Sequence, residues 1–275
     1  MDDRAYSHPK VNVHDPSGTL RYELKAARTA EDILDIHIKA ARDYVIDNNI
    51  TDPVIIDRIV ESVMNSATAR LEEMGLTWIQ DTQNAAIIRS NVTIGKMGHM
   101  SIVLGPTGLP KDMTRELAVN VMNDVQSLTI DIRKNVSRTL IEGVQQGLGA
   151  RELGKRVAEV TDGDLARART IARTTVMKTH NRTATETYKR AGATGYNIYP
   201  AYDERLCDKC KAIVFKNGES GELEVFDLRV NELLPIHPNC RCAVIGVWED
   251  SAPVVVDDTH YSAQIVPITF EEVRA

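Results

Sequence analysis

Aromatic residues are scarce in this chain of 275 residues, where they make up 5% of the total against 43% for hydrophobic residues as a whole. A core built mainly from aliphatic side chains suits helix-on-helix packing better than a β-sandwich. The sequence also lacks any apolar run near the roughly 20 residues that a membrane-spanning helix needs. Residues 1–5 are followed by no apolar segment of the kind that starts a secretory signal. We therefore expect a protein of the cytoplasm, at least at first, with no membrane partner.

Positive charge is not in excess, because the formal net charge is −6, and this excludes a uniformly basic nucleic-acid coat. The charges are nevertheless distributed unevenly. Residues 151–190 contain ten Lys and Arg against five Asp and Glu, whereas residues 249–275 contain six acids and one base. The basic segment suits either a solvated helix face or non-specific contact with double-stranded DNA. The candidate DNA contacts are Lys178, Arg182, Lys189 and Arg190.

Apolar residues recur at three-to-four spacing over most of the first 190 residues, which predicts amphipathic helices. The first helix is expected to begin at Thr29, in a sequence that resembles a capping box. The second is expected to begin at Pro53, after Asp52, and to end at Gly75. Further helices are predicted over 76–97, 111–147, 150–160 and 165–191, with Asp162 to Asp164 capping the last. The glycines and prolines between 95 and 110 predict a loop.

The pattern changes after Gly195, where residues 196–202 alternate in polarity and residues 243–248 favour a β-strand. The predicted fold class is mainly α, with an elongated helical N-terminal part and a small C-terminal α+β domain of zinc-binding type. The predicted segments are an N-terminal arm (1–27), a long-helix region (28–150), a domain with the Cys/His cluster (151–248) and an acidic C-terminal tail (249–275). The tail holds short apolar stretches that could add a strand to a neighbour or dock on a partner.

All four cysteines lie in one short stretch with the spacing of metal ligands. Cys207 and Cys210 form a C-x2-C pair, and His237, Cys240 and Cys242 follow after a loop. Zinc takes four ligands in a structural site, so four of these five residues are the expected metal ligands, with Cys240 and Cys242 competing for the fourth position. Such a closed site stabilises folding and leaves no position for substrate.

Two other interpretations of the cysteines remain open: disulfide bonds formed outside a reducing compartment, or buried free thiols. A zinc ion is the interpretation that the spacing favours. The β-element also has few aromatic residues, so we expect it to have little core of its own and to depend on the metal to join its two halves.

Several motifs resemble the Mu F-type phage head morphogenesis family. The family pattern is a helix with ARTE, then D-x-R-T-C-x-x-C, then PP-x-H-P-N-C-R-C. Its counterparts in this chain are Arg167–Thr174, Tyr202–Cys210 and Pro235–Cys242, with Asn181 and Gly192 between them. Three positions depart from the pattern: Thr175 replaces the family's acid, Leu206 replaces a threonine and Leu234 replaces the first proline. The resemblance covers residues 151–248.

The resemblance implies a structural minor head (minor capsid) protein of a tailed phage and not an enzyme. Such a virion protein associates with the portal vertex or the inner capsid and acts in head assembly, DNA packaging or DNA ejection. The implied partners are the portal protein and a major capsid or scaffolding protein, with non-specific double-stranded DNA as a further one. The implied location is the head interior or portal vertex of the virion, with host cytoplasm during assembly.

Other functions fit the residues less well. A metal-dependent nuclease needs a general base and a phosphate-binding metal in one cleft, but His237 is already a candidate ligand and His180 and His260 lie in unrelated contexts. Arg205 more simply pairs with Asp203 or caps the turn that presents Cys207. A DNA-binding zinc module remains an alternative, although the basic residues of 165–191 do not share one helix face. An ADP-ribosyltransferase would need an added domain with a catalytic glutamate in its active-site motif, and we do not favour it.

Overall fold

The computed structural model describes residues 15–97, 109–201, 206–216, 221–228, 233–249 and 255–256. Several residues discussed above lie outside these ranges, namely the first part of the predicted arm, the loop at 98–108, Asp203, Arg205, His260 and most of the acidic tail. Four long helices are described: α1 (Leu20–Asp47), α2 (Pro53–Lys96), α3 (Lys111–Gln145) and α4 (Ala150–Arg190). They are followed by β1 (Gly195–Tyr199), α5 (Asp208–Val214), β2 (Gly221–Glu222), β3 (Val225–Asp227), β4 (Ala243–Val247) and β5 (Val255–Val256).

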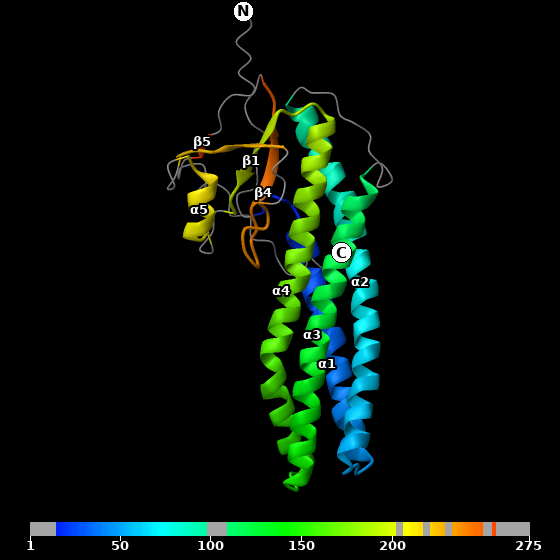
Figure 1. Cartoon of the computed structure of the whole chain (residues 1–275). Coiled ribbons are helices and arrows are strands. Elements are labelled where there is room, and N and C mark those ends of the chain that lie inside the picture. Colours follow the sequence, from blue (N-terminus) through cyan, green and yellow to red (C-terminus); the bar gives the residue numbers. More distant parts are fainter. Residues whose placement is uncertain are drawn as a thin grey trace, which may run out of the picture. The chain divides into compact units, whose positions relative to one another are not determined.

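The predicted fold class is confirmed, since long helices precede a small C-terminal region of sheet and helix that contains the Cys/His cluster (Figure 1). The chain forms two compact units. The helical unit comprises residues 24–79 and 115–175, and the mixed unit comprises residues up to 23, 80–114 and 176–275. The boundaries fall within α1, α2, α3 and α4. None of the described helices is both long enough and apolar enough to span a membrane.

The helical unit is a bundle in which segments of the four long helices run side by side (Figure 1). Aliphatic side chains at three-to-four spacing fill its interior, as the sequence pattern predicted. Polar contacts join neighbouring helices at the surface. The Arg133 guanidinium lies 2.6 Å from a Glu61 carboxylate oxygen and 3.1 Å from one of Asp57. These partly exposed ion pairs contribute little to stability, so burial of the aliphatic stripes holds the bundle together.

Three predicted helix boundaries are wrong. The first helix begins at Leu20, within the predicted arm, because the Asp15 carboxylate accepts hydrogen bonds from the amides of Thr19 and Leu20 and caps it. Gly75 does not end a helix, and α2 runs through it. At this point α3 approaches closely, since a Cβ on Gly75 would lie 3.1 Å from a methyl carbon of Val121. Gly163 likewise lies inside one continuous helix, α4, where the sequence predicted two.

The mixed unit contains an antiparallel sheet with strand order β3-β1-β4, in which Tyr196 of β1 is opposite Gly246 of β4. The predicted strands after Gly195 and at 243–248 are thereby confirmed. The tail strand β5 pairs with β2 of the same chain. Gly246 allows α4 to lie close to the sheet, because a Cβ there would come within 2.8 Å of the Tyr188 ring.

The expectation that this region has little core of its own is wrong. Its buried cluster gathers many of the chain's few aromatic side chains, with Tyr188 and Trp248 in edge-to-face contact at 6.0 Å between ring centroids. The Trp248 indole also donates a hydrogen bond to the Ala191 carbonyl at 3.0 Å. The cysteines Cys210, Cys240 and Cys242 belong to the same buried cluster. The Cys/His cluster is therefore set into an aromatic core.

Candidate metal centre

Cys207 and Cys210 are presented by the first turn of α5. Cys207 occupies the N-cap position with an extended backbone, and its carbonyl accepts the Lys211 amide at 3.1 Å. Cys210 lies one turn further and is buried. The two-residue spacing of the pair thus places both thiols at the same end of the short helix. The backbone amide of Cys210 donates a hydrogen bond that lowers the pKa of the Cys207 thiol.

His237 and Cys240 are the ends of a tight turn. The Cys240 amide donates to the His237 carbonyl at 3.0 Å, Pro238 follows His237, and Asn239 has φ of 61°. Proline at the second position of a turn and a residue with positive φ at the third are typical of a type II turn, and asparagine tolerates that conformation. The sequence His-Pro-Asn-Cys therefore forms a turn that brings a histidine and a cysteine together.

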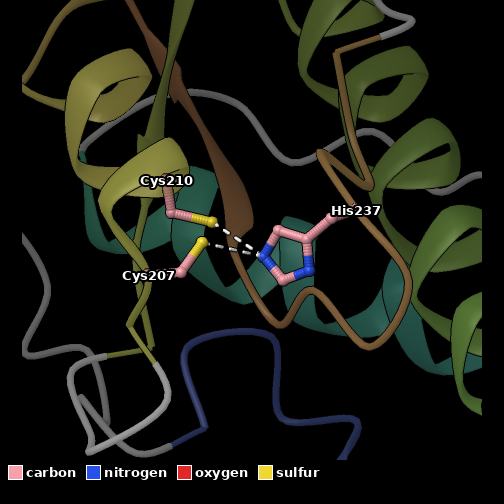
Figure 2. A group of neighbouring side chains, drawn as sticks. All are labelled: Cys207, Cys210 and His237. Atoms are coloured by element: carbon pink, nitrogen blue, oxygen red, sulfur yellow. Dashed lines mark hydrogen bonds between the residues drawn. The ribbon is translucent and has the colours of Figure 1, made fainter.

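The histidine ring faces the two thiols of α5 (Figure 2). Its Nε2 lies 3.3 Å from the sulfur of Cys207 and 3.2 Å from that of Cys210. The other ring nitrogen, Nδ1, lies 2.8 Å from the Pro238 carbonyl oxygen, which can only accept a hydrogen bond. Nδ1 therefore carries a proton, which directs the Nε2 lone pair at the sulfurs in the tautomer that binds a metal.

The remaining two cysteines, Cys240 and Cys242, lie close to Cys210 of the first pair. The sulfurs of Cys210, Cys240 and Cys242 lie within 4.8 Å of one another, as do the ligand atoms of Cys207, Cys210 and His237. Hydrogen bonds from Cys210 and Cys242 lower the pKa of the Cys240 thiol. Burial acts to lower the pKa of His237, but the Pro238 carbonyl and the negative charge of the Cys240 and Cys207 sulfurs outweigh it and raise that pKa.

These distances fit a tetrahedral metal. With bonds of the usual length to sulfur and nitrogen, adjacent zinc ligands are about 3.5 Å apart, close to the Nε2–sulfur separations of 3.2 and 3.3 Å. Three thiols and an imidazole are also a donor set that zinc prefers. The structure brings all five predicted ligand residues together in two overlapping groups, either of which could hold a metal ion. Which four of them bind it stays a prediction.

A buried amide fixes the strand that carries the last cysteine. Asn181 of α4 donates to the Cys242 carbonyl at 2.9 Å and accepts from the Val244 amide at 3.1 Å. Its side chain satisfies two backbone groups just where β4 begins. Spacing rules alone give no reason to select this residue, although it lies in the string that resembles the Mu F-type family.

The candidate DNA contacts all lie on α4 in the mixed unit. Lys189 and Arg190 are exposed, whereas Lys178 and Arg182 are partly buried. The Arg190 side chain lies 2.7 Å from a Glu186 carboxylate oxygen and is already paired. DNA contact by these four residues stays a prediction.

Comparison with known proteins gives one family. Residues 134–245 match the family model described as Phage Mu protein F like protein. The matched segment begins within α3, includes all of α4 and ends in β4, so it contains the complete Cys/His cluster. No curated protein and no solved structure matches the chain. The match confirms the resemblance found in the sequence and supports a phage head morphogenesis protein.

Proposed function

Since residues 134–245 carry the Mu F-type family signature, we propose that this protein is a structural minor head protein of a tailed phage. In this proposal it associates with the portal vertex or inner capsid and acts in head assembly, DNA packaging or DNA ejection. The observation that carries the proposal is the family match, which spans the whole ligand cluster and the helix that supports it.

The proposed role of the cluster is structural. We assign a zinc ion to Cys207, Cys210, His237 and Cys240, because the tight turn that presents His237 also presents Cys240. Cys242 would then donate a hydrogen bond to the Cys240 sulfur. When bound, the ion would tie the start of α5 to the turn before β4, which are separated by more than twenty residues of chain.

Action by binding, without catalysis, agrees with this arrangement. Four protein ligands fill the coordination sphere of zinc and leave no open position for a substrate or an activated water. Within the described residues, His180 is the other histidine of the mixed unit, and it is buried with its pKa lowered to about 3 by desolvation and, secondarily, by the charge of Arg89. Such a group is a poor general base at neutral pH.

The partner proposal is tested by co-expression with the portal protein encoded by the same phage. We expect the chain to co-purify with the portal oligomer and to be found in purified heads by mass spectrometry. Major capsid and scaffolding proteins are the comparison partners in the same pull-down. A chain that is absent from heads and binds none of the three would contradict the proposal, whatever its metal content.

A further inference from the structure

A cavity of about 280 Å³ lies in the mixed unit among α2, α4 and β4. None of the five cluster residues lines it. Its polar lining consists of Arg89, Ser90, Thr93 and Lys96 from α2, and His180 and Tyr188 from α4. Small-molecule pockets usually range upward from about 300 Å³, so this cavity suits a single small group.

The charge of the lining is positive. Arg89 and Lys96 both contribute to it, and no aspartate or glutamate does so among the residues that the structure describes. Neither cation forms a salt bridge with another described residue. Two cations at one cavity without a neutralising carboxylate attract an anion.

The wall of the cavity includes His180, a buried polar side chain that lacks one hydrogen-bond partner among the described residues. His180 is 4% exposed, and its Nδ1 has no hydrogen-bond partner among the described residues. An unsatisfied buried polar atom costs about 1–3 kcal/mol, and such atoms in folded proteins call for an explanation. Burial lowers the pKa of His180 to about 3, with the nearby Arg89 charge adding to the effect, so the ring is neutral. A ligand oxygen in the cavity would supply a partner for the ring.

Arg89 is positioned by the turn before α1. Its guanidinium contacts the Pro16 carbonyl oxygen at 3.5 Å. It also lies against Gly18, which has φ of +67°, and a Cβ there would be 1.7 Å from one of the guanidinium nitrogens. The positive φ and this close approach both require glycine. The turn therefore leaves room for the Arg89 side chain at the cavity.

We propose that this cavity binds a phosphate group. Arg89 and Lys96 would balance its charge and, with the His180 ring, would hydrogen-bond its oxygens, while the hydroxyls of Ser90 and Thr93 hydrogen-bond Tyr188 in the cavity wall. A phosphate group has more acceptor oxygens than a carboxylate, and so matches a set of several donors better. The group could be free phosphate or part of a nucleic-acid backbone. The inference is independent of the zinc site and of the head-protein proposal.

Calorimetric titration of the full chain with inorganic phosphate tests this site. We expect binding by the wild type, and about tenfold weaker binding for Arg89→Gln and Lys96→Gln, because a charge-assisted hydrogen bond contributes about 1.5–3 kcal/mol. Arg89→Lys should recover part of the loss. The matched control is Lys155→Gln, which removes one exposed cation of the helical unit and should change affinity by less than about twofold. Circular dichroism checks that each variant is folded.

A second titration with a short DNA duplex separates the two sources of phosphate. Loss of both phosphate and DNA binding in Arg89→Gln supports a site for backbone phosphate. Loss of phosphate binding alone supports a site for a free phosphate. The proposal is overturned if wild-type protein binds neither, or if Lys155→Gln weakens phosphate binding as much as the two cavity variants do.

Discussion

Asn239 shows how one residue shapes the candidate metal centre. Its positive φ closes the turn in which the Cys240 amide meets the His237 carbonyl. Most residues other than glycine and asparagine adopt a positive φ only at an energetic cost. The clustering of these Cys and His side chains could be predicted from sequence because it depends on such local rules: two-residue spacing at the start of a helix, and a proline–asparagine turn.

Serine substitutions test which cysteines bind the metal. We expect Cys207→Ser, Cys210→Ser and Cys240→Ser to lose bound zinc and to lower the melting temperature, because each removes a thiolate ligand. Cys242→Ser serves as the matched control, since we assign it no bond to the ion, and it should retain zinc. Elemental analysis of each purified variant gives the metal content. Zinc retained in Cys240→Ser and lost in Cys242→Ser would reverse the assignment of the fourth ligand.

His180 should make stability depend on pH. Its folded pKa of about 3 lies below the ordinary 6.5, mainly because of burial. The unfolded chain therefore binds more protons between these values, and stability falls as the pH is lowered through that window. We expect a loss of about 2 kcal/mol between pH 7.5 and 5 from this group alone. Urea unfolding at several pH values should show a clearly smaller loss in His180→Gln than in the control His37→Gln, and equal losses in the two would refute the assignment.

At the scale of elements, the long helices were predicted well and their ends less well. The aliphatic stripes are periodic and extend over many turns, so the existence of the helices is evident from sequence. The interruptions expected at Gly75 and Gly163 do not occur, because a glycine costs a helix only about 1 kcal/mol, less than the packing of the flanking turns contributes. Gly75 instead lies where α2 packs closely against Val121 of α3. Such a tertiary contact cannot be predicted from the local sequence pattern.

Alanine substitutions at two helical glycines, Gly163 and Gly143, should change the stability of the protein in opposite directions. Gly163 is exposed, and a Cβ there would meet no atom within 4 Å, so Gly163→Ala should stabilise the protein by about 0.5–1 kcal/mol. Gly143 is buried, and a Cβ there would lie 2.4 Å from a Leu153 methyl carbon, so Gly143→Ala should destabilise it. Thermal unfolding of both variants measures the difference. Equal shifts of the melting temperature with the same sign would contradict the described packing of α3 on α4.

The join between α4 and β4 depends on Asn181. Replacing it by alanine leaves the buried Cys242 carbonyl and Val244 amide without that partner, which should cost about 2–4 kcal/mol. Asn181→Asp keeps the acceptor for Val244 but removes the donor to Cys242. Chemical denaturation should rank wild type above both variants. An alanine variant as stable as the wild type would contradict the described contacts.

At the scale of the whole molecule, the sequence matches a family model over residues 134–245 but gives no mechanism. The matched residues include the cluster and its supporting helix α4. The aromatic core, the Asn181 bridge and the cavity at Arg89 and His180 join segments far apart in the chain. Neither spacing nor periodicity encodes such contacts, which explains why the clustering of the Cys and His residues could be predicted from the sequence and their surroundings could not.

The central claim is that a metal held by the Cys/His cluster stabilises the mixed unit. Native mass spectrometry of protein purified without chelator, combined with hydrogen exchange before and after chelation, tests it most directly. We predict about one zinc ion per chain, and on its removal faster exchange in β1, α5 and β4 with little change in the 24–79 and 115–175 segments. A metal-free chain with four free thiols, whose exchange is unchanged by chelator, would contradict the claim.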